Sequence, residues 1–282
     1  FRIAGAVEFA ETEQGLVKAA VSRDGMTGEL FLQGAQVTGW QPPGAPPVIF
    51  TSSRAVFAPG KAIRGGIPVI FPWFGPHPTD PQAAQHGWAR NTLWQLDEVE
   101  AGGDAVTFAL SLARDGFELN YRVSFGTQLH LTLAAVNSSA SPMAFEEALH
   151  TYFAVSDVER ISISGLGASE FIDKTGNMQR RPASRALFLL TKETDSVYLD
   201  VPARQVITDP GWGRIIEIMT TGTDSAIVWN PWPEKAAAMS DLGADNWRGF
   251  VCVETGNVAD NRIHLPPGAR HVMTTRIAIG DG

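Results

Sequence analysis

Three consecutive runs of alternating apolar residues, AVTFALSL (105–112), LNYRVSF (119–125) and LHLTLAA (129–135), lie in the middle of the chain. In each run every second residue is large and apolar, so an extended strand would carry its hydrophobic side chains on one face. Short polar or glycine-containing breaks separate the runs, which is typical of turns between neighbouring strands. This stretch predicts three antiparallel strands connected as a meander.

The same period of two recurs along the rest of the chain. Only PEKAAAMSDL (233–242) indicates a helix, with Pro233 suited to its first turn. Many short strands without a dividing linker predict an all-β fold, a sandwich or a barrel, in a single domain over residues 1–282. The Pro- and Gly-rich segment 39–81 is expected to be a long ordered loop or a set of short strands. The further strands expected are Leu16–Ser22, Glu29–Gln33, Val158–Ser164, Ser196–Val201, Arg214–Met219, Ala226–Asn230, Phe250–Glu254 and Val272–Ala278.

Composition excludes several classes of function. The net charge is −8 and no block of Lys or Arg occurs, which argues against nonspecific binding of nucleic acid. The longest apolar runs stop well short of the roughly 20 residues that a membrane span needs, and no signal peptide is visible. The single cysteine, Cys252, forbids an internal disulfide and fits a reducing compartment. We therefore expect an acidic, cytoplasmic protein, most simply a monomer, with a small-molecule partner.

Two arginines flank a segment dense in Gly, Pro and aromatic residues. Arg64 opens RGGIPVIFPWFGPH (64–77), and Arg90 closes HGWAR (86–90). No carboxylate lies between Ile63 and Gly75, although arginine is rarely buried without a partner. Either both guanidinium groups point into water, or they converge on an anion that the chain does not supply.

The stretch FEEALHTYFAV (145–155) collects polar groups on one face. If it is a strand, His150 shares a face with Glu146, Ala148 and Tyr152. One interpretation is a half-exposed strand whose polar face is hydrated. The other is a general acid or base presented from a rigid element.

The stretch FVCVETG (250–256) is apolar on both faces until Glu254. A carboxylate in such a strand must be paired or must have a raised pKa, which makes Glu254 a candidate catalytic base. Alternatively, Glu254 reaches solvent before Gly256. Cys252 has no basic neighbour in this apolar run and is expected to be a core residue rather than a nucleophile.

Common cofactor motifs do not occur. There is no HxH, HExxH or cysteine pair, so we expect no metal site. There is no GxGxxG or GxxxxGK[ST] motif either, which excludes the common cradles for dinucleotides and nucleoside triphosphates. We expect no cofactor.

Several motifs together resemble a known family. RGGIPVIFPWFG, QHGWAR, EALHTYFAV, VWNPW with KAAAMSDLG, and VCVETGNV occur in the order of their counterparts in the glucose-6-phosphate 1-epimerases, a branch of the aldose 1-epimerase superfamily. The resemblance extends from about Leu16 to Ile279 and implies a large antiparallel β-sandwich with an open concave sheet. One departure is Thr255, where relatives often carry proline or alanine; it follows the glutamate without threatening its role.

The resemblance also implies a site and a reaction. The reaction is exchange of the α and β anomers of a hexose 6-phosphate: Glu254 takes the proton of the anomeric hydroxyl, charged His150 protonates the ring oxygen, and reclosure reverses both steps. No cofactor is needed. The site residues implied are His150 and Glu254 for catalysis, Arg64 and Arg90 for phosphate, Gln85 and His86 for the sugar, and Asp195 for a sugar contact.

On this interpretation the arginines need no protein carboxylate, because the phosphate is their partner. Gly65 and Gly66 would remove side chains that block close approach of the backbone. Two other hypotheses stay open. One is a glycosidase that pairs Glu254 with Glu146 or Glu147. The other is a noncatalytic sugar-phosphate-binding or sensor protein, which would need the arginines and aromatic residues but not the His–Glu pair.

Overall fold

The computed structural model describes residues 1–184 and 187–282, and this part of the chain is built almost entirely of β-strands. The helical elements are α1 (Trp232–Ala238), η1 (Ala89–Asn91), η2 (Asn246–Gly249) and η3 (Ala259–Asn261). The strands are β1 (Val7–Glu11), β2 (Val17–Arg23), β3 (Met26–Phe31), β4 (Gln36–Gln41), β5 (Val69–Ile70), β6 (Gln95–Gly102), β7 (Ala105–Arg114), β8 (Phe117–Phe125), β9 (Leu129–Asn137), β10 (Met143–Phe145), β11 (Glu147–Leu149), β12 (Tyr152–Ala154), β13 (Ser162–Ser164), β14 (Phe171–Asp173), β15 (Gln179–Arg181), β16 (Thr194–Leu199), β17 (Arg204–Asp209), β18 (Arg214–Thr221), β19 (Ser225–Asn230), β20 (Phe250–Asn257), β21 (Ile263–Leu265) and β22 (Arg270–Asp281).

The predicted meander is confirmed as β7, β8 and β9. In its antiparallel register Leu110 stands opposite Tyr121, which in turn stands opposite Leu133. All three side chains are buried, so the alternating apolar residues line up across the strands on the core-facing side. Burying one such side chain stabilises the fold by roughly 1.5–3 kcal/mol. The alternation that predicted the strands also fixed their register, because a slip by one residue would expose the whole apolar face.

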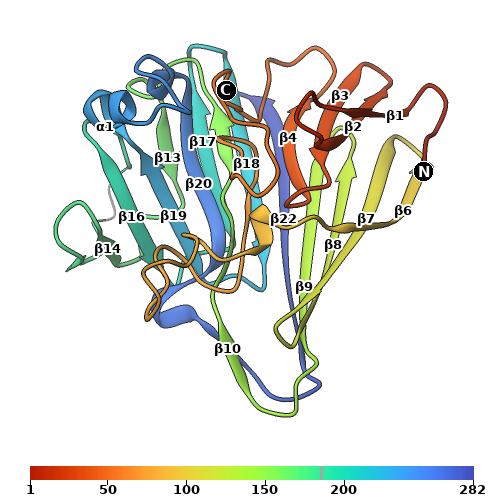
Figure 1. Cartoon of the computed structure of the whole chain (residues 1–282). Coiled ribbons are helices and arrows are strands. Elements are labelled where there is room, and N and C mark those ends of the chain that lie inside the picture. The colour runs from red at the N-terminus through yellow and green to blue at the C-terminus, as the bar shows by residue number, and fades with distance from the viewer. Residues whose placement is uncertain (185–186) are drawn as a thin grey trace.

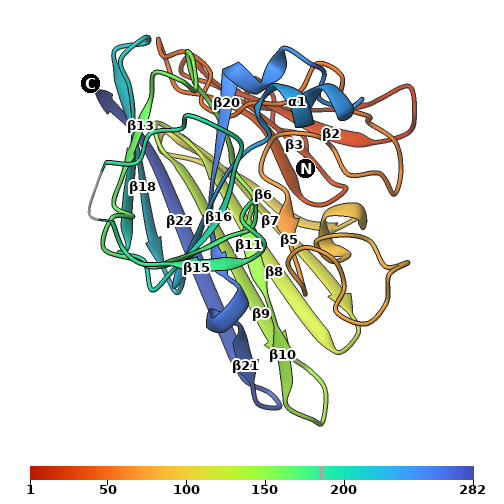
Figure 2. The same ribbon diagram turned by 90° about the vertical axis from the view of Figure 1, so that its left-hand side faces the viewer.

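Two large antiparallel sheets form the body of the molecule (Figure 1). The meander sheet has the strand order β13-β17-β18-β22-β9-β8-β7-β6, and the site sheet has the order β15-β14-β16-β19-β20-β11-β5, with β12 also paired to β20. A four-stranded sheet, β1-β2-β3-β4, and α1 lie at one end, and the pair β10-β21 projects from the other (Figures 1 and 2). The predicted all-β antiparallel fold is confirmed as a sandwich.

Strand β20 runs through the middle of the site sheet and is buried along its whole length. On its inner face, Thr255 Oγ1 lies 2.7 Å from Thr275 Oγ1 of β22, so this hydrogen bond joins the two large sheets. Because side chains alternate along a strand, Phe250, Cys252 and Glu254 point to the opposite face. That outer face is covered by the loops around β5, and Glu254 is therefore held between a sheet and a layer of loops.

Segment 39–81 combines both predicted possibilities, since it is mostly loop but includes the end of β4, the short strand β5 and isolated bridges. Strand β5 pairs with β11 and brings the segment onto the site sheet. Gly65 and Gly66 are required here for a reason other than the one expected. A Cβ on Gly65 would stand 2.5 Å from the Cα of Thr51, and one on Gly66 would overlap the carbonyl oxygen of Val37. The absence of a side chain at these two positions lets neighbouring backbone approach closely.

Two predicted elements are shorter than expected. The strand expected over Val158–Ser164 is confined to Ser162–Ser164, because a turn in which the Arg160 amide donates to the Asp157 carbonyl occupies its first half. The helix expected over 233–242 ends at Ala238, and Met239 is already extended. Within the described residues, no helix is both long and apolar enough to cross a membrane.

Candidate active site

A cavity of about 360 Å³ opens on the outer face of the site sheet. It is formed where the loops around β5 and η1 cross the ends of β11, β16 and β20, so segments far apart in the chain contribute to it. All seven side chains singled out from the sequence line this one cavity: Arg64, Gln85, His86, Arg90, His150, Asp195 and Glu254.

His150 and Glu254 face each other inside the cavity. His150 lies where the strand breaks between β11 and β12, and its amide donates to the Pro68 carbonyl at 3.0 Å. Its ring stacks on Tyr152 with centroids 4.9 Å apart. His150 Nε2 is 3.5 Å from Glu254 Oε1. His150 is 7% exposed and Glu254 1% exposed, so the alternatives in which each was hydrated are wrong.

Burial disfavours the charged form of both partners. It raises the pKa of Glu254 well above its ordinary value, with Asp195 adding to the shift and Lys174 and Arg90 opposing it. Burial also lowers the pKa of His150 well below its ordinary value, and the neighbouring His86, Arg90 and Arg64 add to the shift. Burial therefore favours the uncharged form of each partner, a neutral imidazole at His150 and a protonated carboxyl at Glu254.

His86 is a neutral hydrogen-bond donor. Its Nδ1 accepts a hydrogen bond of 3.2 Å from the amide of Gly75, so the proton of the neutral ring is on Nε2. Burial, followed by the charges of Arg90, Lys174 and Arg64, lowers the pKa of His86 to about 2. The imidazole thus offers an N–H to a ligand in the cavity without carrying a charge.

Arg90 and Gln85 occupy the same side of the cavity as His86. Arg90 Nη2 donates to the carbonyl of Gln85 at 2.7 Å, whereas Arg90 Nε is buried without a hydrogen-bond partner among the described residues. Burial, to which Arg64 adds, lowers the pKa of Arg90 to about 10, so the guanidinium remains charged at neutral pH. A half-buried guanidinium whose Nε–H is buried and unused is a strong candidate to bind an anion.

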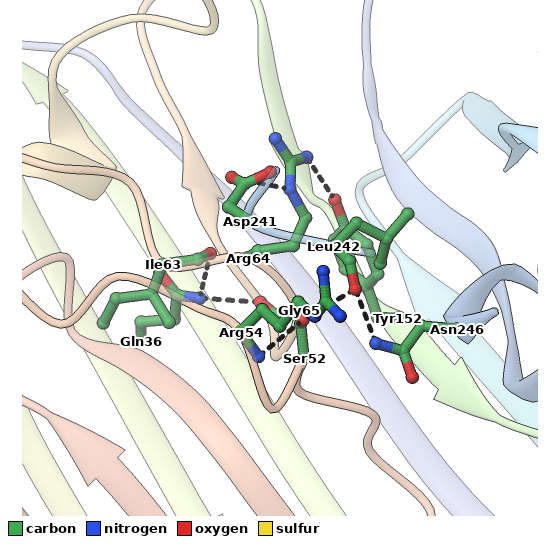
Figure 3. A network of polar contacts seen from close by, with 10 residues as sticks. All are labelled: Gln36, Ser52, Arg54, Ile63, Arg64, Gly65, Tyr152, Asp241, Leu242 and Asn246. Carbon is green, nitrogen blue, oxygen red and sulfur yellow. Dashed lines mark hydrogen bonds and ion pairs between the residues drawn. The ribbon is translucent and has the colours of Figure 1, made fainter. Parts of the chain in front are cut away.

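Arg64 does have a protein carboxylate as partner, contrary to the expectation from the local sequence. Its Nε donates to Asp241 Oδ2 at 3.1 Å and its Nη1 donates to the Tyr152 hydroxyl at 3.1 Å (Figure 3). Burial opposes the charge of Arg64, but Tyr152 and Asp241 outweigh it and raise the pKa. Asp241 is 177 positions away from Arg64, so no local motif could reveal the pair.

Asp195 is not free either, because Lys174 Nζ lies 3.2 Å from its Oδ1. Lys174 also lies 5.0 Å above the Phe74 ring, and Lys235 of α1 lines the cavity while pairing with Glu193 at 2.7 Å. The sequence analysis missed both lysines. Lys174 follows β14 directly, where a lysine normally indicates a solvated turn, and no signal distinguished it.

The carboxylates proposed for a glycosidase are engaged elsewhere. Glu146 accepts hydrogen bonds from the amides of Phe74, at 2.9 Å, and Ala259, at 2.8 Å. Glu147 is fully buried and lies 2.8 Å from His271. Neither lines the cavity, so neither can work with Glu254 as a carboxylate pair.

Cys252 is buried in the main core, as predicted, and burial raises the pKa of its thiol well above the ordinary value. Among the residues that the structure describes, no group of three or more His, Cys, Asp or Glu side chains could hold a metal ion.

Comparison with known proteins places this chain in a family. The family model of aldose 1-epimerase matches residues 19–278. The chain belongs to the aldose 1-epimerase family. It is 35% identical over 240 residues to a protein from Escherichia coli named "Putative glucose-6-phosphate 1-epimerase", covering 82% of this chain and 80% of that protein. A protein of the same name from Cenchrus ciliaris is 32% identical over 280 residues, covering 93% of this chain and 84% of its length.

Solved structures agree with the assignment. A crystal structure described as a "putative mutarotase" from Salmonella typhimurium superposes with a TM-score of 0.92 at 28% identity, covering 100% of this chain and 96% of that one. The galactose 1-epimerase of Lactobacillus acidophilus shares the fold, with a TM-score of 0.76 at 14% identity over 98% and 99% of the two chains. The predicted family, fold and enzyme class are confirmed: the protein is an isomerase of the aldose 1-epimerase type, which interconverts sugar anomers.

Proposed function

We propose that the substrate of this epimerase is a hexose 6-phosphate, most simply glucose 6-phosphate. The proposal rests on the set of residues that line the cavity. A buried His–Glu pair and two arginines line the same space of about 360 Å³. A phosphorylated hexose has both a hemiacetal, which needs an acid and a base, and a dianion, which guanidinium groups bind. The names of the Escherichia coli and Cenchrus ciliaris relatives point to the same substrate.

The His–Glu pair would open and reclose the sugar ring. Glu254 takes the proton of the anomeric hydroxyl while His150 gives a proton to the ring oxygen; the bond from the anomeric carbon to the ring oxygen breaks and a carbonyl forms. Rotation about the adjacent carbon–carbon bond exposes the other face, and the reverse transfers close the ring. The pair needs only one proton, which moves between partners now 3.5 Å apart. Such contacts often tighten when substrate binds.

The remaining residues would orient the sugar and hold its phosphate. Arg64 and Arg90 supply positive charge, and His86 supplies an uncharged N–H donor. Gln85 and Asp195 offer groups that recognise hydroxyls, with Asp195 held by Lys174 at 3.2 Å. Because these residues surround the cavity, they would place the anomeric carbon against the catalytic pair by binding the opposite end of the molecule.

We further propose that the protein works as a cytoplasmic monomer. The lone cysteine, buried and unpaired, suits a reducing compartment. Light scattering of the purified chain would test the monomer.

The experiment that tests the function is exchange spectroscopy by NMR, which measures anomer exchange at equilibrium. Glucose, galactose and mannose 6-phosphates are compared with the corresponding free sugars at equal concentration, each against a sample without enzyme. The proposal expects kcat/KM for at least one 6-phosphate to exceed that of its free sugar by orders of magnitude. Equal acceleration of phosphorylated and free sugars would refute the phosphate specificity while leaving the epimerase class intact.

A further inference from the structure

We propose that Asp241 and Tyr152 are positioning residues that hold the Arg64 guanidinium in the orientation that binds the substrate phosphate. This inference rests on the proposed function and adds to it how the phosphate-binding arginine is made ready before substrate arrives.

Arg64 uses only some of its N–H donors in hydrogen bonds to protein groups, which leaves the others for a ligand. A guanidinium has five N–H groups in a fixed plane. The Nε–H is taken by Asp241 and one Nη1–H by Tyr152, each at 3.1 Å (Figure 3). Among the described residues no partner is found for the other three, which belong to Nη1 and Nη2. Since the plane is rigid, fixing Nε and one Nη1–H also fixes the direction in which these three point.

The backbone of Arg64 is held as firmly as its side chain. Gln36, a fully buried residue of β4, donates its side-chain amide to the carbonyls on both sides of Arg64, to Ile63 at 3.2 Å and to Gly65 at 2.7 Å. The carbonyl of Arg64 itself accepts from the amide of Ser52 at 3.0 Å. The backbone of Arg64 is therefore fixed, and only the orientation of its side chain remains to be set.

Asp241 reaches Arg64 from a loop that is fastened to the same region. The next residue, Leu242, is fully buried, and its carbonyl accepts from the Ser52 hydroxyl at 3.3 Å and from the Asn246 side chain (Figure 3). The loop after α1 and the segment carrying Arg64 thus share Ser52 as an anchor. A carboxylate in this setting is a fixed acceptor rather than a mobile surface charge.

Tyr152 connects Arg64 to the catalytic pair. Its hydroxyl accepts from Arg64, and its ring stacks on His150 at 4.9 Å with an angle of 10° between the planes. Tyr152 itself is buried. One side chain therefore touches both the arginine that would hold the phosphate and the histidine that would protonate the ring oxygen, which fixes the spacing between the two ends of the substrate.

A competing explanation makes the opposite prediction. If the charge of Asp241 merely neutralises Arg64, the carboxylate competes with phosphate, and removing its charge should tighten anion binding. If Asp241 positions Arg64, removing the acceptor should weaken anion binding, because an arginine left free must lose rotamer freedom when the ligand arrives.

The test uses Asp241→Ala, Asp241→Asn and Tyr152→Phe, with Asp245→Asn as matched control; Asp245 is an exposed acid four positions away whose side chain makes no capping hydrogen bond. Calorimetry with inorganic phosphate gives the Kd of each folded protein, and anomer exchange gives KM and kcat for glucose 6-phosphate. The loss of one charge-assisted hydrogen bond predicts about tenfold weaker phosphate binding and higher KM for Asp241→Ala and Tyr152→Phe, with a smaller change in kcat. Asp241→Asn keeps an acceptor oxygen and should lose less than Asp241→Ala.

Tighter phosphate binding by either Asp241 variant would overturn the proposal in favour of charge competition. A fall in kcat with unchanged KM in Tyr152→Phe would also overturn it for Tyr152, since the hydroxyl would then serve His150 alone. The calorimetric result does not need catalysis, so it stands even if the wild-type protein fails to act on glucose 6-phosphate. That failure would refute the proposed function separately.

Discussion

Replacing Glu254 with Gln removes the proposed base with the least change in shape. The side chain is 1% exposed and faces His150 at 3.5 Å, so an isosteric amide keeps the cavity filled but cannot take a proton. A positioned acid or base typically contributes about 10²–10⁴-fold to the rate, which is about 2.7–5.5 kcal/mol of activation free energy. We expect kcat to fall by that factor and KM for the sugar phosphate to stay within a few-fold.

The same substitution should stabilise the fold at neutral pH. Burial raises the pKa of Glu254 above its ordinary value of 4.5, so the folded state holds this proton more tightly than the unfolded state. Wild-type stability therefore falls as pH rises from 4.5 to the folded-state pKa, by up to about 1.4 kcal/mol per pH unit. Glu254→Gln lacks this loss, and its advantage over wild type should grow with pH across that window.

Two assays check these expectations together. Anomer exchange by NMR gives kcat and KM, and urea unfolding at several pH values gives the stability difference. Glu147→Gln is the matched control, because Glu147 is equally buried but lies outside the cavity; it should lose stability and keep its kcat. The double variant His150→Asn with Glu254→Gln should be hardly slower than the slower single variant, since the two act as a unit. Near-normal exchange by folded Glu254→Gln would refute the reasoning.

Three further predictions concern titratable groups, two of them in the site and one outside it. The pH profile of kcat, measured by anomer exchange, should be a bell, because activity is lost when both partners are protonated at low pH and when both are deprotonated at high pH. The lowered pKa of His150 should place the acid limb below 6.5, and the raised pKa of Glu254 should place the alkaline limb above 4.5; a profile that lacks either limb over the whole pH range in which the protein stays folded would contradict the roles. Lys174→Met should move the alkaline limb to higher pH, since Lys174 lowers the pKa of Glu254, and an unmoved limb would count against that contact. Burial lowers the pKa of His271, but Glu147 outweighs burial and raises it. The charged pair therefore stabilises the fold fully below about pH 6.5, and this contribution is lost as the pH rises through the folded-state pKa of His271. Urea unfolding should show that His271→Gln loses more stability at pH 6 than at pH 9, and equal losses at the two pH values would argue against a stabilising ion pair.

The sequence predicted those features that depend on local periodicity. The alternating residues of β7, β8 and β9 predicted strands and register. The doubly apolar strand β20 left two alternatives for Glu254, a buried carboxylate or one that reaches solvent, and the structure confirms the buried one. The convergence of seven site residues on one cavity came from the family resemblance, because strands that are distant in the chain have no local signal for their neighbours.

What escaped prediction depends on tertiary contacts. Asp241 was overlooked because the loop after α1 that carries it meets Arg64 only in the folded chain, and Lys174 was overlooked because its partner lies on β16. The break in the strand after His150 coincides with a tight turn, in which the amide of Thr151 donates to the carbonyl of Leu149. The glycines after Arg64 were correctly seen as sites of close approach, but the approaching group is the protein's own backbone.

The most direct test of the central claim measures anomer exchange of glucose 6-phosphate and free glucose by wild type, Arg64→Ala and Arg90→Ala. Both arginines would bind the phosphate, far from the anomeric carbon, so their contacts change little during ring opening and their loss should raise KM more than it lowers kcat. Each charge-assisted contact is worth roughly 1.5–3 kcal/mol, or about 10- to 150-fold in affinity. We predict that loss for glucose 6-phosphate and little change for glucose. Equal losses for the two sugars would contradict the account, because the arginines would then support the fold or the sugar ring.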